Sequence, residues 1–451
     1  MEVTGGNERL RDLLKEAGLT HDATARAVNR VAAENGALLR SNKSSITHWL
    51  GGTRPQPDTI VFLAEAIARR VGRRIQPADL GYGDIGQYDL TELPADPISA
   101  LARLGRADMD RREVLTSAAY SLGALLLPIE QLREHSERTD AAITGRSIGQ
   151  AEVDVVKQVI ATFDFADERL GGGFGRRALV EYLTTDIAAY CQANGPQVTR
   201  EAMYSAAMQL AYLAGWKSHD LMQEGLAQRY YLFAFDLAMM SDDKRQAAYV
   251  MRILAHQAFD LGHYANCLDL AETSTRLIRG QADPHTEALF TMTLARAHAM
   301  RGEKRQALET INEAEKIHER SSPGDTRPTW VKLRHNYGQF HSHIAKTLVD
   351  LGDLDNAAKH FELSLDARAF GSDHDAHALI TGLSQAWLAE VQFKAGRIET
   401  ACGNWASAID RLAPIQSVRG QAEIKKMRSM LIPLKRRNIS DVNRLLSMAA
   451  V

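Results

Sequence analysis

Apolar residues recur at spacings of three and four along almost the whole chain, which is the pattern of amphipathic helices that bury one face. The alternation of apolar and polar positions that indicates a half-buried strand is hard to find. Proline, which interrupts helices, accounts for only 12 of the 451 residues. The pattern therefore predicts an all-α protein.

The first predicted domain covers residues 1–82. Apolar spacing predicts four helices and a short fifth turn there, at 10–14, 23–31, 44–50, 60–67 and 76–80. We expect Gly18 to close the first helix and Thr20 to be the N-cap of the second. Residues 35–42 form a loop, and Gly51-Gly52 ends the third helix.

The rest of the chain divides into a polar linker at 83–108, a helical connecting region at 109–200 and a repeat region at 201–451. The repeat region contains five sites of the form helix, glycine, helix, at Gly215, Gly262, Gly302, Gly352 and Gly396. Their intervals of 47, 40, 50 and 44 residues resemble lengthened tetratricopeptide (TPR) repeats. Such hairpins stack into a superhelix with a concave surface, an α-solenoid. The alternative is an ordinary helical bundle.

Charge is distributed unevenly, although the formal net charge is only −2. Between Arg40 and Arg74 seven Lys or Arg residues stand against two Asp or Glu. A positive segment in a near-neutral chain is typical of a nucleic-acid contact. The alternative is a solvated basic surface.

The stretch SSITHWLGGTRP, residues 44–55, lies in this basic segment. Ile46, Trp49 and Leu50 share one helix face and predict core positions. The outward positions carry small hydroxyls and an imidazole, which suit reading of base edges in a major groove: Ser44, Ser45, Thr47 and His48. Lys43 and Arg54 flank the helix and can bind phosphates. A surface helix that binds nothing is the alternative.

The tract ITHWLGGTRPQPDTIVFLAEAI resembles the helix-turn-helix family of phage Cro and repressor proteins (the XRE family) over residues 7–82. The resemblance implies a five-helix DNA-binding domain with Thr47 and His48 as the base-reading pair and Ser44 and Ser45 beside them. His21 stands where that family usually carries a phosphate-binding Gln. The loop at 35–42 departs from the family by lengthening the connection before the third helix.

The whole chain is similar to actinobacterial regulators that join such a domain to a TPR-like region. The similarity rests on Gly215-Trp216, on the stretches at 227–238 and 255–262, and on DERLGGG at 167–173. It implies a cytoplasmic transcriptional regulator, such as a repressor, of development or secondary metabolism. The alternative is a TPR scaffold that binds a peptide or protein partner without a DNA role.

Partners follow from this hypothesis. We expect a homodimer on a double-stranded DNA operator, because one short helix reads few bases. A small-molecule or peptide effector is expected in the TPR-like groove, and no membrane contact. Candidate ligand residues are aromatic or amide side chains that could equally belong to the core: Trp216, Tyr230, Tyr231, Phe259, Asn336, Tyr337 and Phe340.

The sequence contains no recognisable arrangement of catalytic residues, so we expect neither an enzyme nor a cofactor. GGGFGRR, residues 171–177, lacks the Gly-Lys-Ser/Thr ending of a phosphate loop. His341 and His343 point to different sides of a helix, and His374 with His377 lacks further ligands at metal-binding spacing, so no metal site is expected. Three scattered cysteines predict free thiols in a reducing cytosol. The twin-arginine-like segment after residue 110 is interpreted as a buried helix, and the basic segment at 425–437 as a solvated face or second DNA contact.

Overall fold

The computed structural model describes residues 6–35, 37–83, 96–109, 144–322, 328, 330–331, 337–366, 378–437 and 440–448. Contacts divide the chain into two compact units. The first consists of Met1–Gly149 and Arg177–Ser241, and the second of Gln150–Arg176 and Asp242–Val451. Each unit is described by itself.

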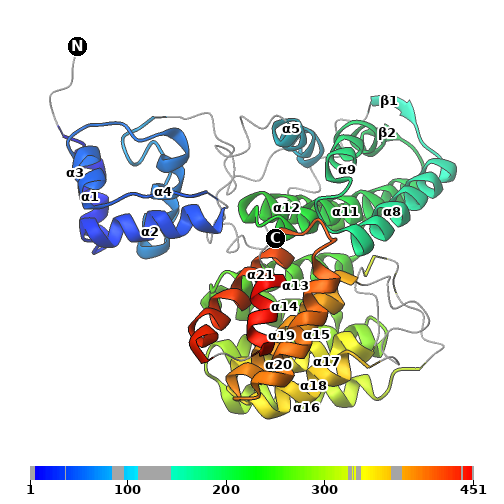
Figure 1. The fold of residues 1–451 in the computed structure, drawn as a ribbon. Coiled ribbons are helices and arrows are strands. Elements are labelled where there is room, and N and C mark those ends of the chain that lie inside the picture. Colours follow the sequence, from blue (N-terminus) through cyan, green and yellow to red (C-terminus); the bar gives the residue numbers. More distant parts are fainter. Residues whose placement is uncertain are drawn as a thin grey trace. The chain divides into compact units, whose positions relative to one another are not determined.

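The first unit begins with a domain of four helices in residues 6–35 and 37–83 (Figure 1): α1 (Glu8–Glu16), α2 (His21–Glu34), α3 (Lys43–Leu50) and α4 (Pro57–Val71). They share one apolar core, to which Leu10, Val28, Ile46 and Leu63 each contribute a fully buried side chain. The helix order follows the prediction, and residues 77–80 form the expected short turn, where the family resemblance implied a fifth helix. The Asp79 carboxylate accepts the Gln76 N–H there, at 2.8 Å.

Helix starts in this domain are set by polar side chains that accept free N–H groups of the first turn. Asn7 accepts from Leu10, and Thr20, the predicted N-cap, accepts from Ala23 at 3.2 Å. The loop before α3 is fastened by Asn29, whose side chain makes two hydrogen bonds with the backbone of Ser41, both 2.9 Å.

The remainder of the first unit contains α5 (Pro97–Met109), α9 (Arg176–Tyr182), the π-helical turn η3 (Leu183–Ile187), α10 (Ala188–Cys191) and the hairpin α11 (Gln197–Asp220) with α12 (Glu224–Met240). Helix α5 lies in the segment predicted as a linker. Strands β1 (Thr144–Ser147) and β2 (Ala193–Asn194) pair in parallel, a small exception to the all-α pattern. Residues 110–143, including the twin-arginine-like segment, lie outside the described residues.

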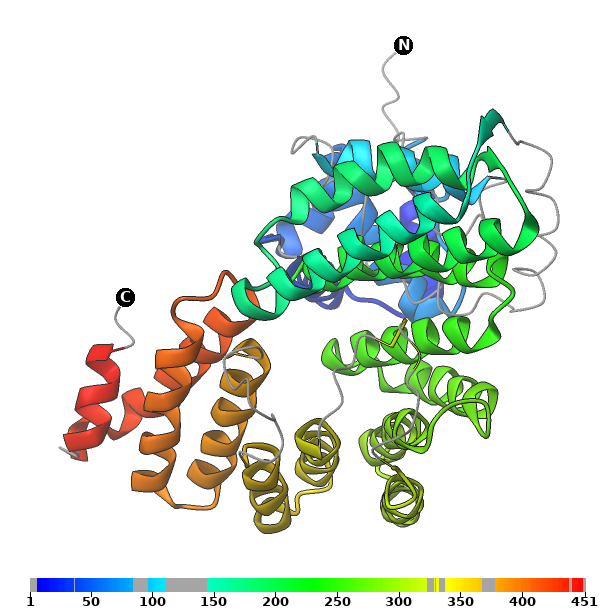
Figure 2. The same cartoon turned by 90° about the vertical axis from the view of Figure 1, so that its right-hand side faces the viewer.

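The second unit is a row of antiparallel hairpins preceded by α8 (Gln150–Leu170). The hairpins are α13 (Lys244–Asp260) with α14 (Tyr264–Ile278), α15 (Pro284–Met300) with α16 (Lys304–His318), α17 (Tyr337–Asp350) with α18 (Leu354–Ser364), and α19 (Ala378–Lys394) with α20 (Ile398–Leu412). The chain then continues through α21 (Val418–Leu431), the 3₁₀ turn η6 (Ile432–Arg437) and α22 (Ser440–Met448). Figure 2 shows the hairpins following one another in chain order.

Neighbouring hairpins bury their apolar faces on one another, as a repeat architecture requires. Helix α14 contacts α15, α15 contacts α17, and α18 contacts α19. One apolar cluster unites three successive hairpins through Leu289, Phe340, Phe361 and Leu388. The predicted all-α class and the stack of helical hairpins are therefore confirmed.

Four of the five predicted glycine turns are present. Gly262, Gly302, Gly352 and Gly396 join the helices of the four hairpins with φ of 78°, 77°, 79° and 79°. These left-handed conformations favour glycine, because a side chain there would clash with the backbone. Gly215 was wrongly assigned, since it lies inside α11. The turn after α11 uses Met222, at φ 58°.

Gly215 is small for a different reason. A Cβ at this position would lie 2.6 Å from two ring carbons of Tyr231 and 3.1 Å from the carbonyl oxygen of Ala227. Glycine therefore allows α12 to approach α11 closely. The spacing of small residues along the sequence cannot distinguish a close helix approach from a turn.

The glycine-rich stretch at 171–175, which lacks a phosphate-loop ending, is a turn after α8. Gly173 N–H donates to the carbonyl of Gln416 at 3.1 Å, and Gln416 N–H donates to Leu170 at 2.9 Å. Gly171, at φ 85°, passes within contact of Ile415. Among the described helices, none is both long and apolar enough to cross a membrane.

Candidate functional site

Helix α3 is the first candidate site, and its start is built by Asn42. The Asn42 side chain accepts the N–H of Ser45 at 3.0 Å, and the Ser45 hydroxyl accepts the N–H of Asn42 at 3.3 Å. This reciprocal capping box starts the helix within a loop. The sequence analysis assigned Asn42 only to the loop, although an Asn three residues before a Ser is a recognisable capping pattern.

The faces of α3 divide as predicted. Ile46, Trp49 and Leu50 are buried in the domain core. Lys43, Ser44, Thr47, His48 and Arg54 are exposed, whereas Ser45 is half-buried. Because the Ser45 hydroxyl belongs to the capping box, it is less free to meet a ligand than the exposed Ser44 and His48 side chains.

Thr47 and His21, both predicted DNA contacts, touch each other. The Thr47 hydroxyl donates to the Lys43 carbonyl at 3.0 Å and lies 3.3 Å from Nδ1 of His21. A hydroxyl has one proton, so with that proton used in the helix the His21 ring must donate from Nδ1. The Thr47 hydroxyl then keeps one further lone pair that can accept a hydrogen bond. His21 itself is half-buried.

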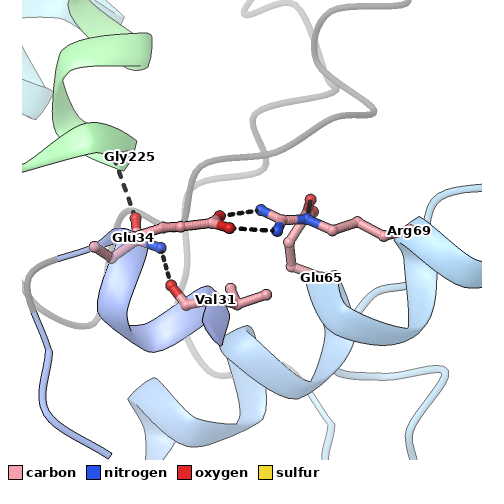
Figure 3. Close-up of polar contacts among 6 residues, drawn as sticks. Val31, Glu34, Glu65, Arg69 and Gly225 are labelled. Atoms are coloured by element: carbon pink, nitrogen blue, oxygen red, sulfur yellow. Dashed lines mark hydrogen bonds and ion pairs between the residues drawn. The ribbon is translucent and has the colours of Figure 1, made fainter. Parts of the chain in front are cut away.

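The basic segment is partly neutralised by carboxylates from earlier helices, which the count from 40 to 74 left out. Arg69 binds Glu34 through two hydrogen bonds of 3.1 and 2.8 Å and binds Glu65 at 2.8 Å (Figure 3). Arg73 pairs with Glu16 at 2.7 Å. Lys43 and Arg54 are therefore better candidates for a phosphate contact than Arg69 and Arg73.

The same end of α2 also contacts the first unit's helical hairpin. The Asn35 side chain donates to the Val31 carbonyl at 2.6 Å, and its oxygen accepts the N–H of Gly225, in the first turn of α12, at 3.1 Å (Figure 3). A free N–H at a helix start thus finds an acceptor from a distant part of the sequence.

The predicted ligand residues are divided between the two units. Tyr230 is 0% exposed and donates to Asp108 at 2.6 Å, within the first unit. Phe340 is 1% exposed and lies in the apolar cluster of the second unit. Trp216 is half-buried and stacks on Tyr212, with ring centroids 6.5 Å apart. Tyr231 and Phe259 are also core residues. Asn336 and the side chain of Tyr337 lie outside the described residues.

A second candidate site, which the sequence analysis missed, lies on the first helices of the second unit's hairpins. We call it the first-helix surface, and it comprises Arg252, His256, Thr293, Arg296, His343 and Lys346. These residues belong to α13, α15 and α17, and all except the buried Arg252 and Thr293 are half-buried. Arg252 and His256 are one helical turn apart, a spacing that could have indicated a shared polar face.

Contacts join the residues of the first-helix surface across three helices. Arg252 lies 3.4 Å from Nε2 of His343, and Nε2 of His256 lies 3.3 Å from the Thr293 hydroxyl. The two imidazole rings are 5.3 Å apart between centroids. Arginine has only donors, so His343 accepts through Nε2 and carries its proton on Nδ1.

Electrostatics keep both imidazoles of this surface neutral. Burial, followed by the positive charge of Arg252, holds the pKa of His256 and of His343 well below the usual range. A second positive charge beside a cationic, poorly solvated group is unfavourable. The histidines therefore act here as neutral hydrogen-bonding groups.

Other histidines of the second unit pair with one another. His341 lies 2.9 Å from His360 between Nδ1 atoms, and His285 lies 3.2 Å from His318. His341 and His343 thus contact different neighbours, as their spacing predicted. Among the described residues, no three His, Cys, Asp or Glu side chains gather as a metal ion would require. His374 and His377 lie outside these residues.

Comparison with known proteins gives a family only for the first domain. Residues 10–83 match a family model described as the SP15 N-terminal domain. No curated protein matches the chain.

Two solved structures show a low overall likeness. The chain is similar to a Rap protein complexed with competence and sporulation factor, with 13% identity over 90% of this chain and 98% of that chain, at a TM-score of 0.39. It is also similar to a circular tandem repeat protein with a novel repeat topology, with 13% identity over 98% and 85%, at a TM-score of 0.15. Both TM-scores are below 0.5, so neither likeness carries an argument about function.

Proposed function

We propose that the chain is a helical-repeat protein that binds a peptide or protein partner and has no catalytic role. The observation that supports this is the first-helix surface. The hairpins are held together by apolar side chains such as Leu289 and Phe361. Half-buried cations add nothing to that packing and cost free energy of desolvation. Contacts with a bound partner would offset this cost.

A photo-crosslinking experiment tests this proposal. A photoreactive amino acid is placed at His256, on the first-helix surface, or at Lys316, which is exposed on α16. Irradiation of cells that produce each full-length variant, followed by mass spectrometry of the adducts, should give a defined partner from position 256 and none from position 316. Identical adducts from both positions, or none from either, would contradict the proposal.

A second candidate function is sequence-specific DNA binding, as expected of a transcriptional regulator acting as a cytoplasmic homodimer. Its support is the exposed face of α3. Ser44, Thr47 and His48 lie outward, with Lys43 and Arg54 exposed at the two ends of the helix. Side chains of this size permit close approach to base edges, and flanking cations suit phosphates.

Selection of duplexes from a random DNA pool by the full chain tests this second function. If a sequence is enriched, Lys43→Ala should weaken binding to every duplex and reduce the salt dependence, by about 0.9 in the log–log slope for one phosphate contact. His48→Ala should instead narrow the difference between the selected and random sequences, by about 1–3 kcal/mol for one base contact. Failure to enrich any sequence would refute DNA reading but leave partner binding standing.

A further inference from the structure

Three cationic side chains lie on the first-helix surface, on three successive hairpins. Arg252 lies on α13, Arg296 on α15 and Lys346 on α17. Arg296 pairs with Asp350 at 3.0 Å and approaches Asp260 at 3.8 Å. Among the described residues, both carboxylates pair with Arg296 and neither pairs with Lys346.

In the described part of the chain, Lys346 pairs with no carboxylate. Its ammonium lies 3.8 Å from the centroid of the Trp387 ring, on α19. Within the described residues, no oxygen accepts a hydrogen bond from this ammonium. An ammonium has three donors, and a charged group with unused donors in a poorly solvated place gains strongly from an added acceptor.

The neighbours of Lys346 add to its positive field. Burial, together with the charges of Arg296 and Arg419, lowers the pKa of the Lys346 ammonium to about 7, although Asp260 and Asp350 oppose this effect. The adjacent His256 and His343 are neutral and offer ring nitrogens as hydrogen-bonding groups. A bound anion would therefore satisfy the ammonium directly and restore its charged form.

We propose that Lys346 and its neighbours on the first-helix surface bind a side-chain carboxylate of an acidic peptide segment. The proposal rests on the proposed partner-binding function and names the chemistry of the partner. A side-chain carboxylate would give the Lys346 ammonium the acceptor it lacks, whereas the double charge of a phosphate would meet stronger repulsion from Asp260 and Asp350. Trp387 would contact the apolar part of the same segment, because its ring already borders the ammonium.

Affinity selection from a synthetic library of random decapeptides tests this proposal. The library has amidated C-termini and equal amounts of Asp, Glu, Asn and Gln, and the peptides retained by the immobilised full chain are identified by mass spectrometry. We expect retained peptides to favour Asp and Glu over Asn and Gln by about tenfold, the equivalent of one added charge-assisted contact of ~1.4 kcal/mol.

Matched variants assign the preference to Lys346. Lys346→Gln should abolish the acidic preference, and Lys346→Arg should retain it because the positive charge remains. Lys359→Gln is the control, because this substitution removes an equal charge from an exposed residue on α18 of the same hairpin. A thermal melt of each variant verifies that the hairpins remain folded.

The outcomes separate the two proposals. Retention of peptides without acidic preference, or an acidic preference unchanged in Lys346→Gln, overturns the carboxylate site and leaves partner binding standing. Retention of no peptide by any variant contradicts peptide binding and the carboxylate site together. Free glutarate that displaces the acidic peptides at micromolar concentration would show a small-molecule site and would also overturn the proposal.

Discussion

Replacing Arg69 by Met should destabilise the first domain far more than the replacement of an exposed charged residue does. The Arg69 guanidinium connects α4 to α2 through Glu34 and holds Glu65 of its own helix (Figure 3). The three side chains are only 12%, 10% and 9% exposed. Methionine keeps the length of the side chain but removes the guanidinium that both poorly solvated carboxylates bind.

The size of the effect follows from burial. Removing one partner of a buried ion pair costs about 3–5 kcal/mol, because the remaining charge is uncompensated. Each 1.4 kcal/mol changes an equilibrium about tenfold. Amide hydrogen exchange in the full-length chain should therefore accelerate roughly hundredfold to thousandfold for the best-protected amides of α2 and α4.

Two variants decide whether this reasoning is correct. Arg73→Met removes a similar two-bond pair with Glu16, but one that is about half exposed, so exchange should change little. Adding Glu34→Gln to Arg69→Met should recover part of the protection, because one stranded charge is gone. Equal effects of the Arg69 and Arg73 variants would refute the argument from burial.

Two further predictions concern the hairpins. Gly215→Ala should lower the free energy of unfolding of the first unit by about 1–3 kcal/mol, because its Cβ meets the Tyr231 ring at 2.6 Å. In a thermal melt, Gly403→Ala, where a Cβ meets nothing within 4 Å, should instead be neutral or stabilising. Burial lowers the pKa of Lys346 to about 7 in the folded chain, so the unfolded chain holds the extra proton between pH 7 and 10.5 and stability rises with pH there. Urea denaturation of Lys346→Met should show no such rise, and the variant should exceed the wild type in stability most at pH 6–7. If the stabilities of variant and wild type change with pH in parallel, Lys346 is not the cause of the rise.

The helix starts and buried faces within the first domain were predictable because their causes are local. Thr20 caps α2 through an N–H three residues away, and the apolar spacing of Ile46, Trp49 and Leu50 selects the buried face of α3. Such signals lie within one or two helical turns of the residues that they affect. The exposed face of α3 follows from the same spacing.

Glycine turns show where local patterns stop being sufficient. Gly262 and Gly302 occupy left-handed turns, as predicted, but Gly215 accommodates a ring from another helix. Met222 takes the left-handed position that a glycine was expected to hold. A small residue after an apolar stretch is compatible with either role, and only the partner across the interface distinguishes them.

The number of charged residues in a segment could be predicted, but their ion-pair partners could not. Glu16 and Glu34 stand outside the basic segment, yet they neutralise Arg73 and Arg69 in space. In the repeats, cations gather in space without a basic segment in the sequence. Arg252, Arg296 and Lys346 are each separated by more than 40 residues.

The amino-acid sequence by itself determined the helical class, the hairpin repeat and the outward face of α3, because helix periodicity and capping act over a few residues. The tertiary structure alone decided which aromatic side chains are core, which arginines remain available and where Lys346 meets Trp387. Those outcomes depend on packing between helices distant in sequence, since burial and charge pairing are properties of neighbours in space.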